Sequence, residues 1–328
     1  MRKLFFITPL LILILIIIFI SGCVEKSEAP TNDTDVEELP TEESQTDVNT
    51  TLDEKEAIDD ALKNAKRVEN TSISGKFHEN QLWSGEILIT GDTHIDGDLT
   101  ILPGTVVRFV VGDDVGWGNE VPPDGYNDLD PTRLKSYEIT HSDLVVNGKL
   151  KAIGTPDKRI IFTSEASKPN YADWVGIHVG ADRSIMEYCV VEWSRHGIAL
   201  GPNTPNTVIK NNIINYTFWG SISSGFSSSQ IYGNEIWESG HEGIDVQGGN
   251  PVIENNKIYN VHTGIVILSG SAIVKNNTMV NVGDGIHVAG ATPTLENNNI
   301  GLAPSDSKLE WSYGNFAYLM FGNPVIRG

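Results

Sequence analysis

The sequence holds little cysteine and little positive charge. Its 328 residues include two cysteines, so no framework of several disulfides can form, and Cys189 lies in an apolar run where a buried thiol is expected. Lysine and arginine total 23 against 43 aspartates and glutamates, which gives a formal net charge of -20 at pH 7. A surface of that sign repels a phosphate backbone, so we expect no nucleic-acid partner.

Long apolar runs are scarce too, and the one at the N-terminus predicts export. Two basic residues precede an apolar stretch that ends in Ile20-Ser21-Gly22-Cys23. This order is typical of a secretory signal, so we expect residues 1–22 to be a signal peptide and Cys23 to receive a lipid. An uncleaved signal anchor is the alternative, because the stretch lies at the lower length limit for spanning a bilayer. Both interpretations anchor the chain to the cell membrane and place its body outside the cytoplasm.

Residues 23–70 are predicted to form an acidic, lipid-anchored tether. The segment is dense in acidic residues, Thr and Ser, and it has too little apolar surface to offset the entropy of folding. Over residues 52–68, apolar side chains such as Ile58 and Leu62 fall on one side of a helix. We expect this helix to cap the domain that follows, because bare strand edges invite aggregation. A transient helix within a disordered tether is the alternative.

A repeat of 21 to 22 residues dominates the rest of the chain. Five asparagines, each inside an apolar-x-x-Asn-x-apolar frame, recur at steps of 22, 22, 21 and 21 residues: Asn212, Asn234, Asn256, Asn277 and Asn298. A glycine that opens a short apolar alternation recurs in phase with them, as in Gly243-Ile244-Asp245-Val246. Two markers with one period indicate one repeated structural unit.

The repeat length predicts a β-solenoid. The unit is too short for two helices and a turn, and the alternation has the two-residue period of a strand with one buried face. Leucine-rich repeats share the length, but their Leu-x-x-Leu-x-Leu signature is absent. We therefore expect an all-β domain of stacked coils over residues 71–328, with a loop insertion over residues 112–142. The asparagines should occupy a corner, where stacked amides bond along the axis.

These markers resemble those of the right-handed parallel β-helix proteins of the pectin-lyase-like superfamily. The resemblance covers roughly residues 72–328 and is similar in particular to surface members and to copper-maturation β-helix proteins. It implies a single-stranded right-handed parallel β-helix, a fold that commonly holds a polysaccharide along one face. The Asp-Asp and Gly-His-Gly signatures of polygalacturonase-like relatives are absent, as is an evident calcium-plus-arginine arrangement like that of pectate lyases.

Aromatic residues next to the glycine markers suggest a carbohydrate site. Trp174, Phe218 and Trp219 offer flat apolar faces for sugar rings, and His196 adds a polar group for hydroxyls.

The same edge offers candidate metal ligands. His241, Glu242 and His262 come from adjacent coils about 4.8 Å apart, close enough to share a transition-metal ion. Solvated side chains at a turn are the third interpretation of this edge.

Carboxylates on this edge suggest a hydrolase or lyase. Glycosidases need two carboxyl groups that face one bond. Glu242 and Asp284 stand two coils apart, about 9.6 Å by the sheet spacing, which is compatible with an inverting pair. Asp245 lies nearby as a third candidate catalytic residue.

The loop insertion offers candidate calcium ligands. Asp124, Asn127, Asp128 and Asp130 place oxygen ligands around a glycine, as calcium loops do. The match to an EF-hand is poor because no glutamate closes the loop at the required spacing. A plain projecting loop is the alternative.

The sequence thus predicts a cell-surface β-helix protein that binds envelope glycans or surface proteins along its solenoid face. A polysaccharide hydrolase or lyase is the first alternative, and a structural or adhesive spacer is the second. Calcium and a transition metal are the cofactors that the side chains suggest.

Overall fold

The computed structural model describes residues 63–111, 141–305 and 316–327, all within the unit of residues 51–328. The predicted signal segment 1–22, the lipidation site Cys23 and the calcium candidates Asp124, Asn127, Asp128 and Asp130 lie outside the described residues. Among the described residues, no helix is long and apolar enough to cross a membrane. Nearly all regular structure is β: the described residues form 27 strands, paired in parallel.

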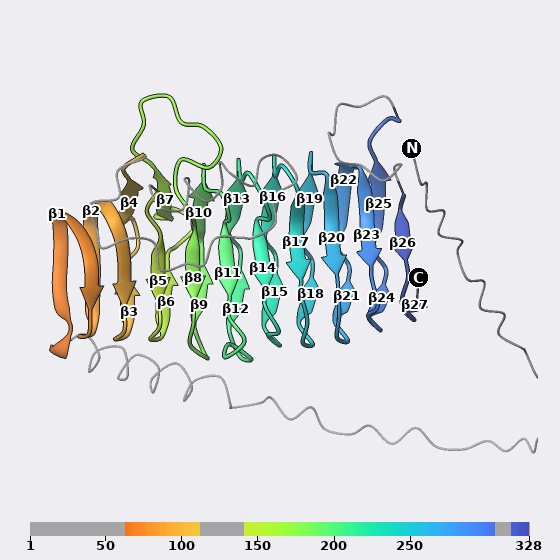
Figure 1. Ribbon diagram of the computed structural model, residues 1–328, viewed down its shortest axis with the longest axis horizontal. Helices are drawn as coiled ribbons and strands as arrows, with labels where there is room; N and C mark the ends of the chain where they lie inside the picture. The colour runs from red at the N-terminus through yellow and green to blue at the C-terminus, as the bar shows by residue number, and fades with distance from the viewer. Residues whose placement is uncertain (1–62, 112–140, 306–315, 328) are drawn as a thin grey trace, which may run out of the picture. The chain divides into compact units, whose positions relative to one another are not determined.

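The strands form three faces, and each strand pairs with its equivalents in the previous and the next coil (Figure 1). Face A comprises β5 (Leu144–Val146), β8 (Ile177–Val179), β11 (Ile198–Leu200), β14 (Ile222–Ser224), β17 (Glu242–Val246), β20 (Thr263–Ile267), β23 (Asp284–Val288) and β26 (Tyr318–Met320). Face B comprises β3 (Leu99–Ile101), β6 (Leu150–Ile153), β9 (Ile185–Glu187), β12 (Val208–Lys210), β15 (Gln230–Tyr232), β18 (Val252–Glu254), β21 (Ile273–Lys275), β24 (Thr294–Glu296) and β27 (Val325–Arg327). Face C comprises β4 (Val106–Phe109), β7 (Ile160–Ser164), β10 (Cys189–Glu192), β13 (Ile213–Asn215), β16 (Glu235–Trp237), β19 (Lys257–Tyr259), β22 (Thr278–Val282) and β25 (Asn299–Leu302).

The chain runs from face B to face C to face A in each coil, so the coil has an A–B, a B–C and a C–A corner. The first strands are longer than the rest: β1 (Lys66–Phe77) pairs along β2 (Gln81–Ile95), and β2 in turn pairs with β3, β4 and β5 on all three faces. The predicted parallel solenoid is confirmed.

The interior is a stack of aliphatic side chains. Ile244 pairs with Ile265, and Ile265 pairs with Ile286, so the same position lies over itself in successive coils. All three side chains are fully buried. Their outward neighbours on the strand alternate with them, as the two-residue period predicts.

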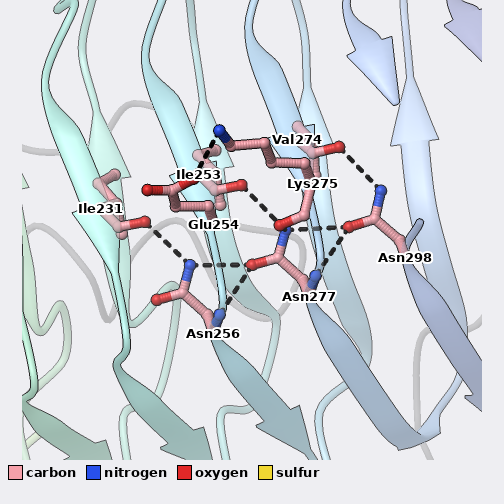
Figure 2. Close-up of polar contacts among 8 residues, drawn as sticks. All are labelled: Ile231, Ile253, Glu254, Asn256, Val274, Lys275, Asn277 and Asn298. Atoms are coloured by element: carbon pink, nitrogen blue, oxygen red, sulfur yellow. Dashed lines mark hydrogen bonds and ion pairs between the residues drawn. The ribbon is translucent and has the colours of Figure 1, made fainter. Parts of the chain in front are cut away.

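The B–C corner holds the asparagine ladder (Figure 2). The Asn256 side-chain oxygen accepts hydrogen bonds from the backbone nitrogen and the amide of Asn234, both at 3.0 Å. Its amide donates to the Ile231 carbonyl at 2.9 Å and to the Asn277 side chain at 3.0 Å. The residue before it, Asn255, has φ 56°, the left-handed conformation that asparagine tolerates. The sequence prediction of stacked corner amides is confirmed.

The N-terminal boundary of the domain differs from the expectation. Strand β1 begins at Lys66, so residues 66–68 of the helix predicted for residues 52–68 are strand, and the solenoid starts before residue 71. Lys66 and Val68 pair in register with Gln81 and Trp83, and this pairing outweighs the local helical pattern. Residues 52–62 of that prediction lie outside the described residues.

Candidate functional site

The predicted sugar-binding residues lie at the C–A corner, and the prediction for one of them, Trp174, is wrong. Trp174 is fully buried; its ring stacks on Phe109 with centroids 3.8 Å apart, and its indole nitrogen donates to the Glu192 carbonyl at 3.0 Å. Trp174 therefore fills the interior of its coil and offers no face to a ligand.

The other predicted aromatic residues are partly buried. The Trp219 ring stacks on His241 with centroids 4.5 Å apart, and His241 stacks on His262 at 5.3 Å. These rings come from successive coils and cover one another, so the faces between them are closed to a sugar. Phe218 and His196 are half-buried at the same corner. Burial and the charge of Arg195 lower the pKa of His196 to about 3, so its ring is neutral at physiological pH.

The structure does not bring the predicted transition-metal ligands together as a metal-binding group. Within the described ranges, no group of three or more His, Cys, Asp or Glu side chains is arranged to hold a metal ion. The His241 ring lies against the Glu242 carboxylate and also stacks on His262, whose ring shares a hydrogen bond of 2.9 Å with the Thr263 hydroxyl. The three side chains are neighbours, but they do not form a metal-binding group.

The candidate catalytic carboxylates are brought onto face A. Glu242 aligns with Thr263, which aligns with Asp284, so the two acids are two coils apart as expected. Both are buried, and Asp284 accepts a hydrogen bond of 3.2 Å from the Phe316 backbone. Asp245 points outward from β17; burial, and then the charge of Glu242, raise its pKa to about 6. A carboxyl group with this pKa can exchange a proton near neutral pH.

A groove of about 320 Å³ lies on face A beside the A–B corner. Small residues such as Gly180, Ala199 and Gly201 line it, and they leave space between the longer side chains. The residues that line it are Val145, Asn147, His178, Val179, Gly180, Ala199, Leu200, Gly201, Ser223, Gly225 and Gln247. The groove thus presents amide, hydroxyl and imidazole groups to one space.

Asp245 borders this groove through two of its lining residues. The Ser223 hydroxyl donates to the Asp245 carboxylate at 3.5 Å, and the Gln247 amide donates to the same oxygen at 3.3 Å. Burial lowers the pKa of His178, which keeps that ring neutral at pH 7. The polar groups of the groove are therefore neutral except at the Asp245 end.

Phe226 is an exposed aromatic residue that the sequence interpretation missed. It follows the groove residue Gly225, is 63% exposed and has φ 59°, an unusual backbone conformation for a bulky residue. Its ring lies against Gly248, where an added Cβ would collide with it. A signal was present in the sequence: the equivalent positions after Ile244 and Ile286 are glycines, so Phe226 breaks the repeat.

The comparisons with known proteins bear on the coils that carry this groove. Residues 163–300 match a family model described as a right-handed β-helix region. This segment is a right-handed β-helix. The match runs from the end of β7 into β25, and the described chain continues the same three faces on both sides of it. Comparison with curated proteins and with solved structures found no match.

Proposed function

We propose that this β-helix binds carbohydrate of the cell envelope in the groove of face A. The observation that carries the proposal is the position of Phe226, a 63% exposed aromatic ring held beside a groove lined by polar side chains. Sugar sites pair a flat apolar surface with a few placed hydrogen-bonding groups.

The polar complement suits hydroxyl groups. Gln247 and Asn147 provide donors and acceptors, Ser223 provides a hydroxyl, and Asp245 provides an acceptor at the border. Because the strands below are fixed by pairing on both sides, these groups are held on a rigid sheet, which lowers the entropy cost of binding. Glycan chains are long, and the repeated coils offer an extended surface for them.

The proposed place of action is the outer side of the cytoplasmic membrane. The signal-like residues 1–22 and the lipid anchor at Cys23 support this placement, and the acidic segment after them serves as the tether. Envelope glycans or surface proteins are then the partners within reach.

A hydrolase or lyase is the second candidate function, and the acid pair on β17 favours it. Burial, and then the charge of Glu242, raise the pKa of Asp245 to about 6, so Asp245 can deliver a proton as the pH falls toward that value. In this alternative Asp245 supplies the proton to the leaving oxygen and Glu242 or Asp284 acts as the base.

Binding is tested on a glycan array with the purified chain and its Phe226→Ala variant. We expect binding to fall about tenfold, the effect of an aromatic contact worth roughly 1.4 kcal/mol. The matched control is Val280→Ala on face C, a residue 52% exposed, which should bind as the parent does. An unchanged affinity of Phe226→Ala contradicts the proposed site.

The second candidate is tested by release of reducing ends from acidic and neutral polysaccharides. Glu242→Gln should abolish that release while retaining glycan binding, and Asp245→Asn should abolish the release as well. If the parent chain neither binds nor cleaves any glycan, the structural spacer becomes the better explanation.

A further inference from the structure

Three aromatic rings gather at the C–A corner, away from the groove. The Trp193 and Tyr216 rings stack with centroids 4.1 Å apart and planes 2° apart. The Tyr171 ring lies 6.1 Å from each of them at 71°, so it stands beside the pair. Tyr171 is 42% exposed, and the other two are partly exposed. We call Tyr171, Trp193, Tyr216 and Glu238 the aromatic corner.

Glu238 continues the row of Trp193 and Tyr216. Because Val191, Ile214 and Ile236 pair in register, the residues two positions later fall at the same place in three successive coils. Trp193 covers one face of Tyr216, and the other face is directed along the axis toward the coil that carries Glu238. Glu238 therefore follows Tyr216 in this row, and its carboxylate is held by Asn260 of the coil after it.

The Glu238 carboxylate is held by an asparagine rather than by a basic residue of the described segments. It accepts a hydrogen bond of 3.1 Å from the Asn260 amide, and Asn260 accepts one of 2.7 Å from Asn281. Over the ranges that the structure describes, no lysine, arginine or histidine forms an ion pair with Glu238, whereas Glu187, Glu254 and Glu296 each pair with one. Burial, and then the charges of Glu238 and Tyr216, raise the pKa of Tyr171, so Glu238 acts electrostatically on the ring beside the stacked pair.

We propose that the aromatic corner binds an alkylammonium group. Ring faces attract a cation within about 6 Å, and a neighbouring carboxylate adds to that attraction. A neutral sugar would gain nothing from the charge of the nearby carboxylate, whereas a cation interacts favourably with both the rings and the carboxylate. This site is independent of the groove, because Phe226 and Gln247 lie at the A–B corner, on the other side of face A.

Calorimetric titration of the purified chain with tetramethylammonium chloride tests the proposal. The neutral control is 3,3-dimethylbutanol, whose tert-butyl group has nearly the shape of tetramethylammonium without the charge. We expect tetramethylammonium to bind and the alcohol to bind about tenfold more weakly or not at all. Equal affinity for the two compounds would overturn the proposal.

Variants assign the binding to this corner. Glu238→Gln should weaken tetramethylammonium binding about tenfold, and Tyr216→Phe, which keeps the ring, should leave it unchanged. Glu254→Gln is the matched control, because that carboxylate is paired with Lys275 at 2.8 Å on the opposite side of the coil. A Glu238→Gln variant that binds as the parent does contradicts the site.

Two further arms separate this proposal from the groove and identify the source of the cation. Phe226→Ala should leave tetramethylammonium binding intact, and Glu238→Gln should leave glycan binding intact, so either proposal can fail alone. Nα-acetyl-lysine amide is titrated against its neutral counterpart Nα-acetyl-norleucine amide, and glucosamine is titrated against glucose. The two pairs show which ammonium group the corner prefers. Equal binding of both charged and both neutral compounds would count against a cation site.

Discussion

Two corners of the coil share a backbone conformation and differ in what occupies it. At the B–C corner, Asn211, Asn255, Asn276 and Asn297 and one tyrosine, Tyr188, have φ between 50° and 57°. At the C–A corner, Trp193, Tyr216, Glu238, Asn260 and Asn281 have φ between 51° and 65°. The left-handed conformation costs roughly 1–2 kcal/mol for most residues, and asparagine bears it best. The repeated turn is therefore a feature of the fold, and the side chains are what distinguish the corners.

The difference separates a structural corner from a candidate binding corner. Ladder amides such as Asn256 bond to the coils before and after them, so the B–C corner is internally satisfied. At the C–A corner, asparagine returns at Asn260 and Asn281, but Trp193, Tyr216 and Glu238 stand where asparagine would be less strained. Strain is characteristically retained where a site needs particular side chains. This contrast supports a function for the aromatic corner beyond holding the turn.

The largest effect is expected from breaking the ladder with Asn256→Ala. This change removes the side-chain partner of the Ile231 carbonyl and of the Asn234 backbone nitrogen, and it takes one hydrogen bond each from the side chains of Asn234 and Asn277. Unmet buried hydrogen bonds cost about 1–3 kcal/mol each, so we expect a loss of about 4 kcal/mol in the free energy of unfolding, measured with urea. Asn255→Gly is the control, because glycine suits φ 56° and Asn255 is exposed. A loss below about 1 kcal/mol would mean that the ladder is not what stabilises this corner.

A smaller effect is expected from Asp245→Asn, and it depends on pH. The raised pKa of about 6 means that the folded state holds a proton that the unfolded chain releases near its ordinary value of 3.8. That stabilisation is complete below pH 3.8 and is lost as the pH rises through about 6. Asparagine does not ionise, so the variant should be more stable than the parent by about 2–3 kcal/mol at pH 7.5 and equal to it near pH 4. A difference that is constant with pH, followed by urea unfolding, contradicts the raised pKa.

The sequence predicted the positions that recur in every coil, and it missed the residues that occur in one coil alone. Ile244, Ile265 and Ile286 repeat in one phase, so their stacking followed from counting, as did the asparagine ladder. Counting along the repeat gave the wrong alignment at Trp219, because the glycine after it resembles the marker Gly243. In the structure Ile222 aligns with Ile244, so Trp219 stacks on His241 and does not lie beside Glu242.

The binding candidates could not be found by the same reasoning. Tyr171, Trp193 and Tyr216 meet in space from three coils, yet each occurs once in a position that other coils fill differently. Trp174 shows the opposite error, in which a residue was predicted to bind ligand but is buried. It lies next to a glycine marker, yet its ring is in the interior beside Phe109. Whether a side chain at a corner turns in or out depends on local turn length, which varies between coils and is not carried by the repeat.

The smallest change in stability, and the sharpest test of the two-corner comparison, comes from Glu238→Asn. Asparagine suits φ 53° and would extend the amide row of Asn260 and Asn281, so the free energy of unfolding should rise by about 1 kcal/mol or stay level. Tetramethylammonium binding should fall as it does in Glu238→Gln, because both variants lack the carboxylate. Glutamine lacks the tolerance for left-handed backbone, so Glu238→Gln should not gain stability. Urea unfolding and calorimetry of both variants then separate backbone strain from binding. A clear loss of stability in Glu238→Asn would show that Glu238 stabilises the fold. The C–A corner would then be a structural corner, as the asparagine ladder is.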